Sequence, residues 1–164
     1  MQAIVAAASS MDALYAVISD RFPVDPALRE AWRKNRTARA TQVRETLRTT
    51  LNTGPKSTAF LGQFLDALYK IRDAALHPSA KHQPPIFHPE LGVSTEWRFW
   101  TFRSDVADSL TCIMGKVLWD IAHFSGEKPI AESQFLSDFK SMISEIFPDG
   151  VPHPSQEQAT FWLP

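Results

Sequence analysis

Residues 104–124, SDVADSLTCIMGKVLWDIAHF, carry the clearest helical pattern in the chain. Their apolar side chains recur at intervals of three and four residues, which is the period of an amphipathic helix. The residues that make this stripe are Val106, Leu110, Ile113, Met114, Val117, Ile121 and Phe124. Ser104 and Asp105 are expected to cap the start of the helix, and Gly126 is expected to end it.

The same period extends over most of the remaining sequence. It predicts helices over residues 3–20, from Pro26 to a break in register near residues 35–37, over 40–51, over 56–76 and from Pro129 to Pro148. The stretch 78–95 holds several prolines and histidines and is expected to form a long loop. Residues 97–102 are aromatic and compatible with one short β element. The fold class is therefore expected to be all-α, a bundle of about five helices.

Length and composition indicate one ordinary globular domain. The chain has 164 residues, of which 44% are hydrophobic and 21% charged. Its single cysteine, Cys112, excludes a disulfide framework and a cysteine-based zinc site. Residues 1–17 contain no basic leader, and Asp12 interrupts their apolar run, so no signal peptide is expected. No apolar stretch is expected to reach the length of about 18 residues that a membrane span needs. We therefore expect a cytoplasmic protein without a membrane partner.

The net charge of −1 conceals an uneven distribution. Residues 21–56 carry nine lysines or arginines against three acids, a local charge of +6, whereas residues 57–164 carry −5. Such a basic segment can attract a polyanion. It can equally form a solvated helix whose arginines pair with acids elsewhere in the fold. The sequence leaves both readings open.

The common enzyme signatures are missing from the sequence. It contains neither a glycine-rich phosphate loop nor a Gly-x-Ser-x-Gly elbow. The histidines His77, His82 and His88 fall within twelve residues, with Glu90 close by, but their spacing follows no ligand pattern. We therefore expect no metal site there. His123 is expected to interact with the carbonyls that end its helix.

Arg72 is out of place in the helix predicted over residues 56–76. With Leu61 as the origin and 100° per residue, Arg72 lies at about 20°, inside the apolar stripe. A guanidinium there is costly unless it is paired or opens onto a polar cleft. Together with Asp73 and His77, it could bind a phosphate and move a proton. Alternatively, Arg72 pairs with a buried acid such as Asp105, Asp108 or Glu96, and His77 only caps the helix.

The run Arg72-Asp73-Ala74-Ala75-Leu76-His77 resembles the motif of the HEPN (higher eukaryote and prokaryote nucleotide-binding) superfamily, in which an arginine precedes a histidine by a few residues. The stretches 11–15, 88–91 and 96–99 are also similar to bacterial members. The resemblance covers residues 1–125 and implies an up-down helical bundle there. Residues 126–164 would add a C-terminal helix and tail packed on the same domain.

The resemblance implies a metal-independent endoribonuclease that needs no cofactor, with a toxin–antitoxin or phage-defence role. Two copies would pair as a homodimer so that both Arg72 and both His77 line one cleft. The RNA 2′-hydroxyl would attack the adjacent phosphodiester and leave a 2′,3′-cyclic phosphate, while Asp73 orients the arginine or the histidine. RNA would be attracted by four arginines: Arg36, Arg39, Arg44 and Arg48. An antitoxin protein would be a further partner, although the sequence reads His77-Pro78-Ser79 where one toxin subgroup has His-x-Tyr.

A catalytically inactive HEPN-like module for dimerisation, nucleotide sensing or RNA binding is the alternative. A ribonuclease needs Arg72 and His77 in one shared, solvent-reachable cleft, whereas an interaction module would bury Arg72 in an ion pair within one protomer. A nucleotide sensor would have a closed aromatic pocket, for which Trp97, Phe99 and Trp100 are candidates. Large aromatic side chains more commonly fill a core.

Overall fold

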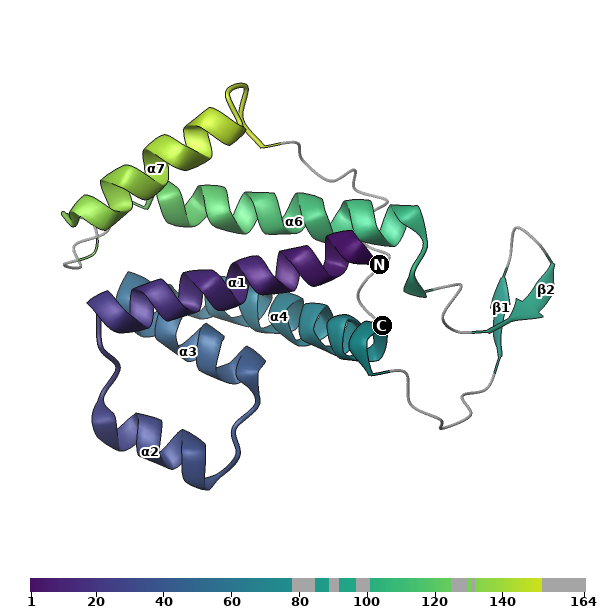
Figure 1. The fold of residues 1–164 in the computed structure, drawn as a ribbon, viewed down its shortest axis with the longest axis horizontal. Helices are drawn as coiled ribbons and strands as arrows, with labels where there is room; N and C mark the ends of the chain where they lie inside the picture. The colour runs from purple at the N-terminus through teal and green to yellow at the C-terminus, as the bar shows by residue number, and fades with distance from the viewer. Residues whose placement is uncertain (78–84, 89–91, 97–100, 125–129, 131, 152–164) are drawn as a thin grey trace.

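The computed structural model describes residues 1–77, 85–88, 92–96, 101–124, 130 and 132–151 (Figure 1). Within these residues the chain is mostly helical, as expected, and it has a single two-stranded sheet. The helices are α1 (Gln2–Arg21), α2 (Pro26–Lys34), α3 (Arg39–Leu51), α4 (Pro55–Leu76), α6 (Ser104–Ala122) and α7 (Gln134–Ile146). The strands are β1 (Ile86–His88) and β2 (Val93–Thr95).

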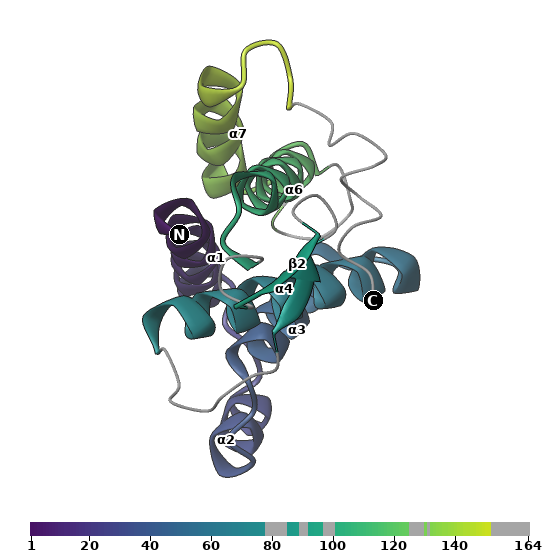
Figure 2. The same cartoon turned by 90° about the vertical axis from the view of Figure 1, so that its right-hand side faces the viewer.

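The core lies between α1, α3, α4 and α6: α1 packs against the other three helices, and α3 packs against α4. α2 and α7 lie on opposite sides of this group in both views (Figures 1 and 2). Each core helix buries the apolar stripe predicted from its sequence. The side chains with almost no exposed surface include Ile4, Met11, Ile18, Val43, Leu47, Leu65, Leu68 and Leu110. Since these side chains come from all four helices, their burial explains why the helices stay together.

Local sequence signals set most helix boundaries where they were expected. Asp25 caps α2 by accepting a hydrogen bond from the Ala27 amide at 2.8 Å, and Pro26 takes the first helical position. Asn52 ends α3 in the left-handed conformation with φ of 53°. His77 leaves the helical conformation before Pro78 and ends α4, as predicted, while its amide still donates to the Asp73 carbonyl at 2.8 Å.

One predicted helix start and one predicted helix cap are wrong. The last helix begins at Gln134 rather than at Pro129, because Ser133 is its cap and accepts a hydrogen bond from the Leu136 amide at 3.2 Å. Ser104 is the first residue of α6 and not its cap, which is Arg103. Asp105 does not cap the helix with its side chain either, since its carboxylate pairs with the Arg103 guanidinium at 2.8 Å.

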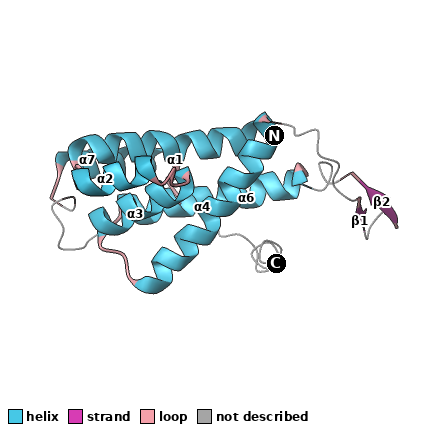
Figure 3. Cartoon of the chain, turned by 90° about the horizontal axis from the view of Figure 1, so that it is seen from below, coloured by secondary structure: helices cyan, strands magenta, loops and turns pink. Residues whose placement is uncertain are grey.

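The structure has an antiparallel hairpin inside the stretch predicted as a loop. Ile86 pairs with Thr95, and His88 pairs with Val93. The hairpin lies beyond the end of the helices (Figure 3). Residues 97–100 are outside the described part of the chain, and Thr101 and Phe102 are in a helical turn. His82, Glu90, His153 and the tail over residues 152–164 are also outside it.

The first helix is more apolar than the sequence analysis expected. Within the described residues, α1 is the one helix that is long and apolar enough to cross a membrane by length and composition, with a mean hydropathy of 1.3. Core helices pass the same criterion. In the structure α1 packs against three other helices, and its one central charge, Asp12, is paired. The apolar side chains of α1 thus form part of the core between the helices.

Candidate functional site

Arg72 lies in the last turns of α4 and is paired with an acid from α1. Its Nη1 donates to Asp12 Oδ2 at 3.1 Å, and the Arg72 side chain is only 20% exposed. The two helices meet with opposite directions, because the start of α1 lies beside the end of α4. This arrangement places the single acid in the apolar stretch of α1 opposite the single arginine in the apolar stripe of α4. The pair satisfies a charge that would otherwise be partly buried alone.

Asp12 also holds two further side chains. Its Oδ1 accepts a hydrogen bond from the Tyr69 hydroxyl at 2.8 Å and another from Arg39 Nε at 2.7 Å. The Arg39 guanidinium stacks over the Tyr15 ring at 4.0 Å, and the Arg72 guanidinium stacks over the Tyr69 ring at 4.4 Å. We call Asp12, Arg39, Tyr69 and Arg72 the Asp12 cluster. It joins α1, α3 and α4 at one point.

The Asp12 cluster perturbs the tyrosine within it. Burial raises the pKa of the Tyr69 hydroxyl, and its hydrogen bond to the Asp12 carboxylate raises it further. The nearby guanidinium groups of Arg39 and Arg72 act in the opposite direction but do not outweigh these effects. Tyr69 is therefore a neutral donor at physiological pH, and the Asp12 carboxylate accepts its hydrogen bond.

Asp73 takes the outer edge of the Arg72 guanidinium. Its Oδ1 accepts from Arg72 Nε at 3.0 Å and from Nη2 at 2.7 Å. In contrast to Arg72, the Asp73 side chain is 58% exposed. The guanidinium is thus held on its inner edge by Asp12, on one face by Tyr69 and on its outer edge by Asp73.

His77 lies at the end of the same helix and is exposed to solvent. Its backbone amide caps α4, as expected under the alternative in which His77 only ends the helix. His77 follows Arg72 by five positions, which corresponds to about 7.5 Å along a helix axis. In the described structure no hydrogen bond or ion pair joins the imidazole to Arg72. One protomer therefore places the two motif residues near each other without bringing them into contact.

An apolar groove adjoins this end of α4. It has a volume of about 410 Å³ and is lined by Met1, Gln2, Val5, Ala6, Ala75 and Leu76. Met1 and Leu76 are both large apolar residues that remain more than half exposed, at 59% and 51%. We call this surface the α1–α4 groove. One of its lining residues, Leu76, directly precedes His77 in the sequence. The surface combines a hollow with exposed apolar side chains.

The four arginines expected to bind RNA do not form one unpaired patch. Arg39 belongs to the Asp12 cluster, while Arg44 and Arg48 both pair with Glu45, at 3.1 and 2.7 Å. Arg36 is exposed in the turn between α2 and α3, where it adopts φ of 49°. Burial raises the pKa of Glu45, but the hydrogen bonds from Arg48 and Arg44 lower it more, so the net shift is downward. Partly exposed ion pairs of this kind are weak, so an RNA phosphate can replace Glu45 as the partner of Arg44 or Arg48. Binding of RNA by these arginines stays a prediction.

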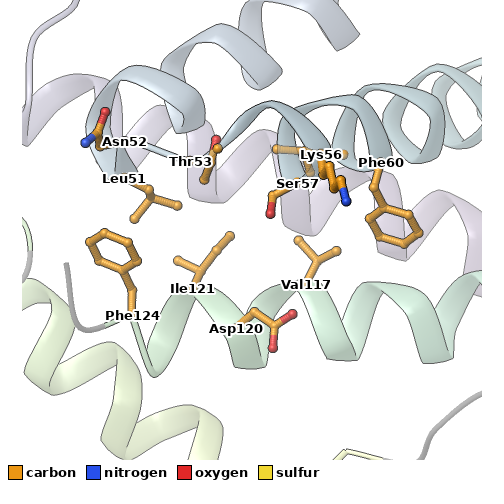
Figure 4. Close-up of a pocket in the computed structure, with 12 residues that line it drawn as sticks. Leu51, Asn52, Thr53, Lys56, Ser57, Phe60, Val117, Asp120, Ile121 and Phe124 are labelled. Atoms are coloured by element: carbon orange, nitrogen blue, oxygen red, sulfur yellow. The ribbon is translucent and has the colours of Figure 1, made fainter.

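A second pocket lies at the opposite end of α4 and contains none of the predicted site residues. It has a volume of about 620 Å³ and lies between the turn that joins α3 to α4 and the last turns of α6. Leu51, Ile121 and Phe124 line its apolar part, and Lys56 and Ser57 lie at the start of α4 (Figure 4). Asp120, also in its lining, is paired with Lys116 at 2.6 Å. This pocket is separate from the Asp12 cluster.

The remaining histidines contribute no site that the structure describes. His123 Nδ1 lies 3.0 Å from the Trp119 carbonyl, and its ring stacks on Trp119 at 3.9 Å, which confirms the expected role at the end of α6. Within the described residues no three histidine, cysteine or acidic side chains are grouped so as to hold a metal. His82 and Glu90 of the loop considered for a metal lie outside those residues, as do Trp97, Phe99 and Trp100.

The sequence analysis missed the acid that pairs with Arg72. The partner is Asp12, and not Asp105, Asp108 or Glu96; Asp105 is bound to Arg103 instead. The signal was present, since Asp12 is the one charge inside the apolar stripe of α1 and Arg72 is the corresponding charge in α4. Two isolated opposite charges in two apolar stripes are candidates for a pair, but the pair follows only once the two helices are known to be neighbours.

The sequence matches no protein-family model, and it matches neither a curated protein nor a solved structure. The function of the site is therefore argued from the residues of this chain.

Proposed function

We propose that this protein is a metal-independent endoribonuclease of the HEPN type, which cuts RNA at a site shared by two copies of the chain. The observation that carries the proposal is the position of Arg72. Its guanidinium is fixed by Asp12 at the end of α4, five residues before an exposed histidine. Cleavage of a phosphodiester needs a positive charge that stabilises the phosphate oxygens and a group that transfers a proton. The Arg72 guanidinium and the His77 imidazole are groups of these two kinds.

The proposed reaction needs two proton transfers and one charge stabilisation. The 2′-oxygen attacks the phosphorus and its proton passes to the imidazole of one His77. The bond from phosphorus to the 5′-oxygen breaks, and the leaving oxygen takes a proton from the His77 of the second copy. Arg72 binds the non-bridging oxygens, whose negative charge increases in the transition state. The products are a 2′,3′-cyclic phosphate and a 5′-hydroxyl.

The α1–α4 groove supports the shared site. In one protomer His77 is exposed and has no described hydrogen bond to Arg72, whereas a cleavage site must hold the RNA between the groups that act on it. Exposed Met1 and Leu76 beside a groove are apolar surface that a second copy of the chain would cover in a twofold interface. Pairing there would bring two copies of the α4 end together. A cytoplasmic toxin or phage-defence role, with an antitoxin as a further partner, belongs to the same proposal.

A second candidate is the catalytically inactive module, acting in dimerisation or RNA binding. The pairing of Arg72 with Asp12 and Asp73 within one protomer favours it, because two carboxylates already offset the guanidinium charge. Under this candidate the Asp12 cluster only stabilises the contact between α1 and α4.

Cleavage of a labelled single-stranded RNA in EDTA tests the proposal. The wild-type protein is expected to cut, and the variants His77→Ala and Arg72→Lys are expected to lose at least about a hundredfold in rate. Asp66→Asn, an exposed change two turns earlier on α4, is the matched control and should cut normally. If the folded wild-type dimer cuts none of several RNAs, the inactive module is the better description. Equal cutting by wild type and His77→Ala would refute the assigned site.

A further inference from the structure

We propose that Asp73 is a built-in competitor for the anion site: in the free protein its carboxylate occupies the edge of Arg72 that a phosphate would bind, and RNA binds by displacing it. This inference deepens the proposed function, on which it rests for the identity of the substrate. It gives Asp73 a role opposite to the one the resemblance implies, since it occludes the arginine instead of assisting it.

The geometry of the guanidinium decides which edge is available. An arginine presents its Nε–H and one Nη–H side by side as a fork that fits two oxygens of a carboxylate or a phosphate. In Arg72 this fork is the Nε–Nη2 edge, and both of its donors go to Asp73, at 3.0 and 2.7 Å. The other terminal nitrogen, Nη1, is engaged by Asp12 at 3.1 Å. A phosphate that binds the Nε–Nη2 edge must therefore take the place of Asp73.

The two acids differ in how easily they can leave. Asp12 is one-third exposed and accepts hydrogen bonds from three side chains of two other helices, so its removal would leave several donors unsatisfied. Asp73 is 58% exposed, and its carboxylate bonds only to Arg72 among the described residues. An ion pair with a partner this exposed is weak, because water competes for the carboxylate. Asp73 is thus the exchangeable partner, and Asp12 is the fixed one.

The bond pattern also shows that Asp73 fits the fork imperfectly. A single oxygen, Oδ1, accepts both hydrogen bonds, whereas a matched bidentate pair uses two oxygens. Adjacent residues on a helix point in different directions, so the contact depends on the long arginine side chain reaching sideways. A phosphodiester offers two non-bridging oxygens to the same two donors. It is therefore the better ligand for this edge.

Displacement leaves the carboxylate of Asp73 close to the bound phosphate. Because two anions then share one site, part of the binding free energy is lost to their repulsion. Removing the charge at position 73 should strengthen phosphate binding through Arg72. Removing an equal charge elsewhere on α4 should have only the small effect of a change in net charge.

Asp66 supplies the matched control. It is exposed on α4 and precedes Asp73 by seven residues, so it lies on the same side of the helix about 10.5 Å away. The variants Asp73→Asn and Asp66→Asn therefore change the net charge equally. The probe is a fluorescein-labelled single-stranded DNA, which has no 2′-hydroxyl and is not cut by the proposed reaction.

In a fluorescence anisotropy titration, we expect Asp73→Asn to bind this probe about fivefold more tightly than wild type, which is the gain that corresponds to the loss of an exposed ion pair. For Asp66→Asn we expect a gain in affinity of less than about twofold. The gain must disappear in an Arg72→Lys background, because lysine keeps the charge but has no fork. In parallel, the Arg72 Nε–H resonance should shift on addition of inorganic phosphate at lower concentration in Asp73→Asn than in wild type.

Binding by Asp73→Asn that equals Asp66→Asn, or falls below wild type, overturns the inference; a fall would assign Asp73 to orienting Arg72. The same holds if the gain persists with Arg72→Lys. Failure of the proposed function gives a different result: RNA is not cut by any variant, while the difference between Asp73→Asn and Asp66→Asn remains. The two failures are thus distinguishable.

Discussion

At the scale of single residues, Asp12 decides how Arg72 is presented. It is the only acid among the residues shown to meet Arg39, Tyr69 and Arg72 together, and it lies between helices that are far apart in the sequence. A carboxylate with this many donors fixes the rotamer of each partner. The position of the Arg72 fork therefore depends on α1 as much as on α4.

Replacing Asp12 with Asn should destabilise the fold by about 2 kcal/mol, between the values for exposed and for buried ion pairs, because Arg39 and Arg72 both lose their charged partner. Urea unfolding followed by circular dichroism measures this difference. Asp20→Asn, an exposed change near the end of the same helix, serves as the control and should stay within about 0.5 kcal/mol of wild type. Equal stability of the two variants would contradict the importance given to the Asp12 cluster.

Tyr69 gives the fold a dependence on alkaline pH. Burial and the Asp12 carboxylate raise the pKa of its hydroxyl above the ordinary value of 10.0, so the folded protein keeps a proton that the unfolded chain releases. Since the unfolded state then binds fewer protons, the free energy of unfolding falls as the pH rises above about 10. Urea titrations at about pH 9 and pH 11 should show this loss. Tyr69→Phe should show a smaller loss, and an identical loss in both proteins would be incompatible with the raised pKa.

At the scale of elements, the helical period predicted the core stripes well. The predicted helix over residues 56–76 differs from α4 by one residue at its start, and its end before Pro78 is correct. The pattern did not reveal the Asp12 cluster, because pairing between stripes depends on which helices become neighbours. Caps were less predictable: Pro129 looked like a helix start, but Ser133 has the hydroxyl that binds the free amides. The hairpin was missed because its strands are only three residues long.

Helix α3 contains a buried threonine, Thr46, whose hydroxyl makes no hydrogen bond with the described residues around it. Thr46 has no exposed surface, and its hydroxyl has no hydrogen-bond partner among the described residues. A buried hydroxyl without a partner costs free energy that a methyl group of similar size does not. Thr46→Val should therefore raise the free energy of unfolding by about 1 kcal/mol in a urea titration. A decrease would mean that the hydroxyl is satisfied in solution.

At the scale of the whole molecule, the shared site depends on self-association through the α1–α4 groove. Leu76→Glu places a charge among the exposed apolar residues of this surface and should convert a dimer of about 37 kDa to the 18.4 kDa monomer. Light scattering coupled to size exclusion measures the mass. Val17→Glu puts the same charge on an exposed apolar position of α1 outside the groove, and it should leave the dimer intact. A wild-type monomer, or dimers in both variants, would exclude pairing at the groove.

The sequence was less informative at this scale than at the others. The basic segment over residues 21–56 suggested an RNA-attracting surface, yet Arg39, Arg44 and Arg48 pair with acids within the protomer. A net local charge counts residues along the chain, whereas the field at a surface depends on acids brought in from other helices. Asp12 is the example, since it lies outside the segment and still binds Arg39. The need of Arg72 for an acidic partner could be predicted from its place in the apolar stripe, but that partner, Asp12, could not be identified from local patterns.

The most direct test of the proposed activity is mass spectrometry of the fragments that the protein produces from a defined single-stranded RNA in EDTA. The account predicts fragments that end in 2′,3′-cyclic phosphate and begin with a 5′-hydroxyl, made by wild type and not by His77→Ala. It also predicts that a 2′-deoxy nucleotide at the cleaved position stops the cut, because the attacking oxygen is then missing. Fragments with 3′-hydroxyl ends, or cutting that tolerates the 2′-deoxy nucleotide, would contradict the mechanism assigned to Arg72 and His77.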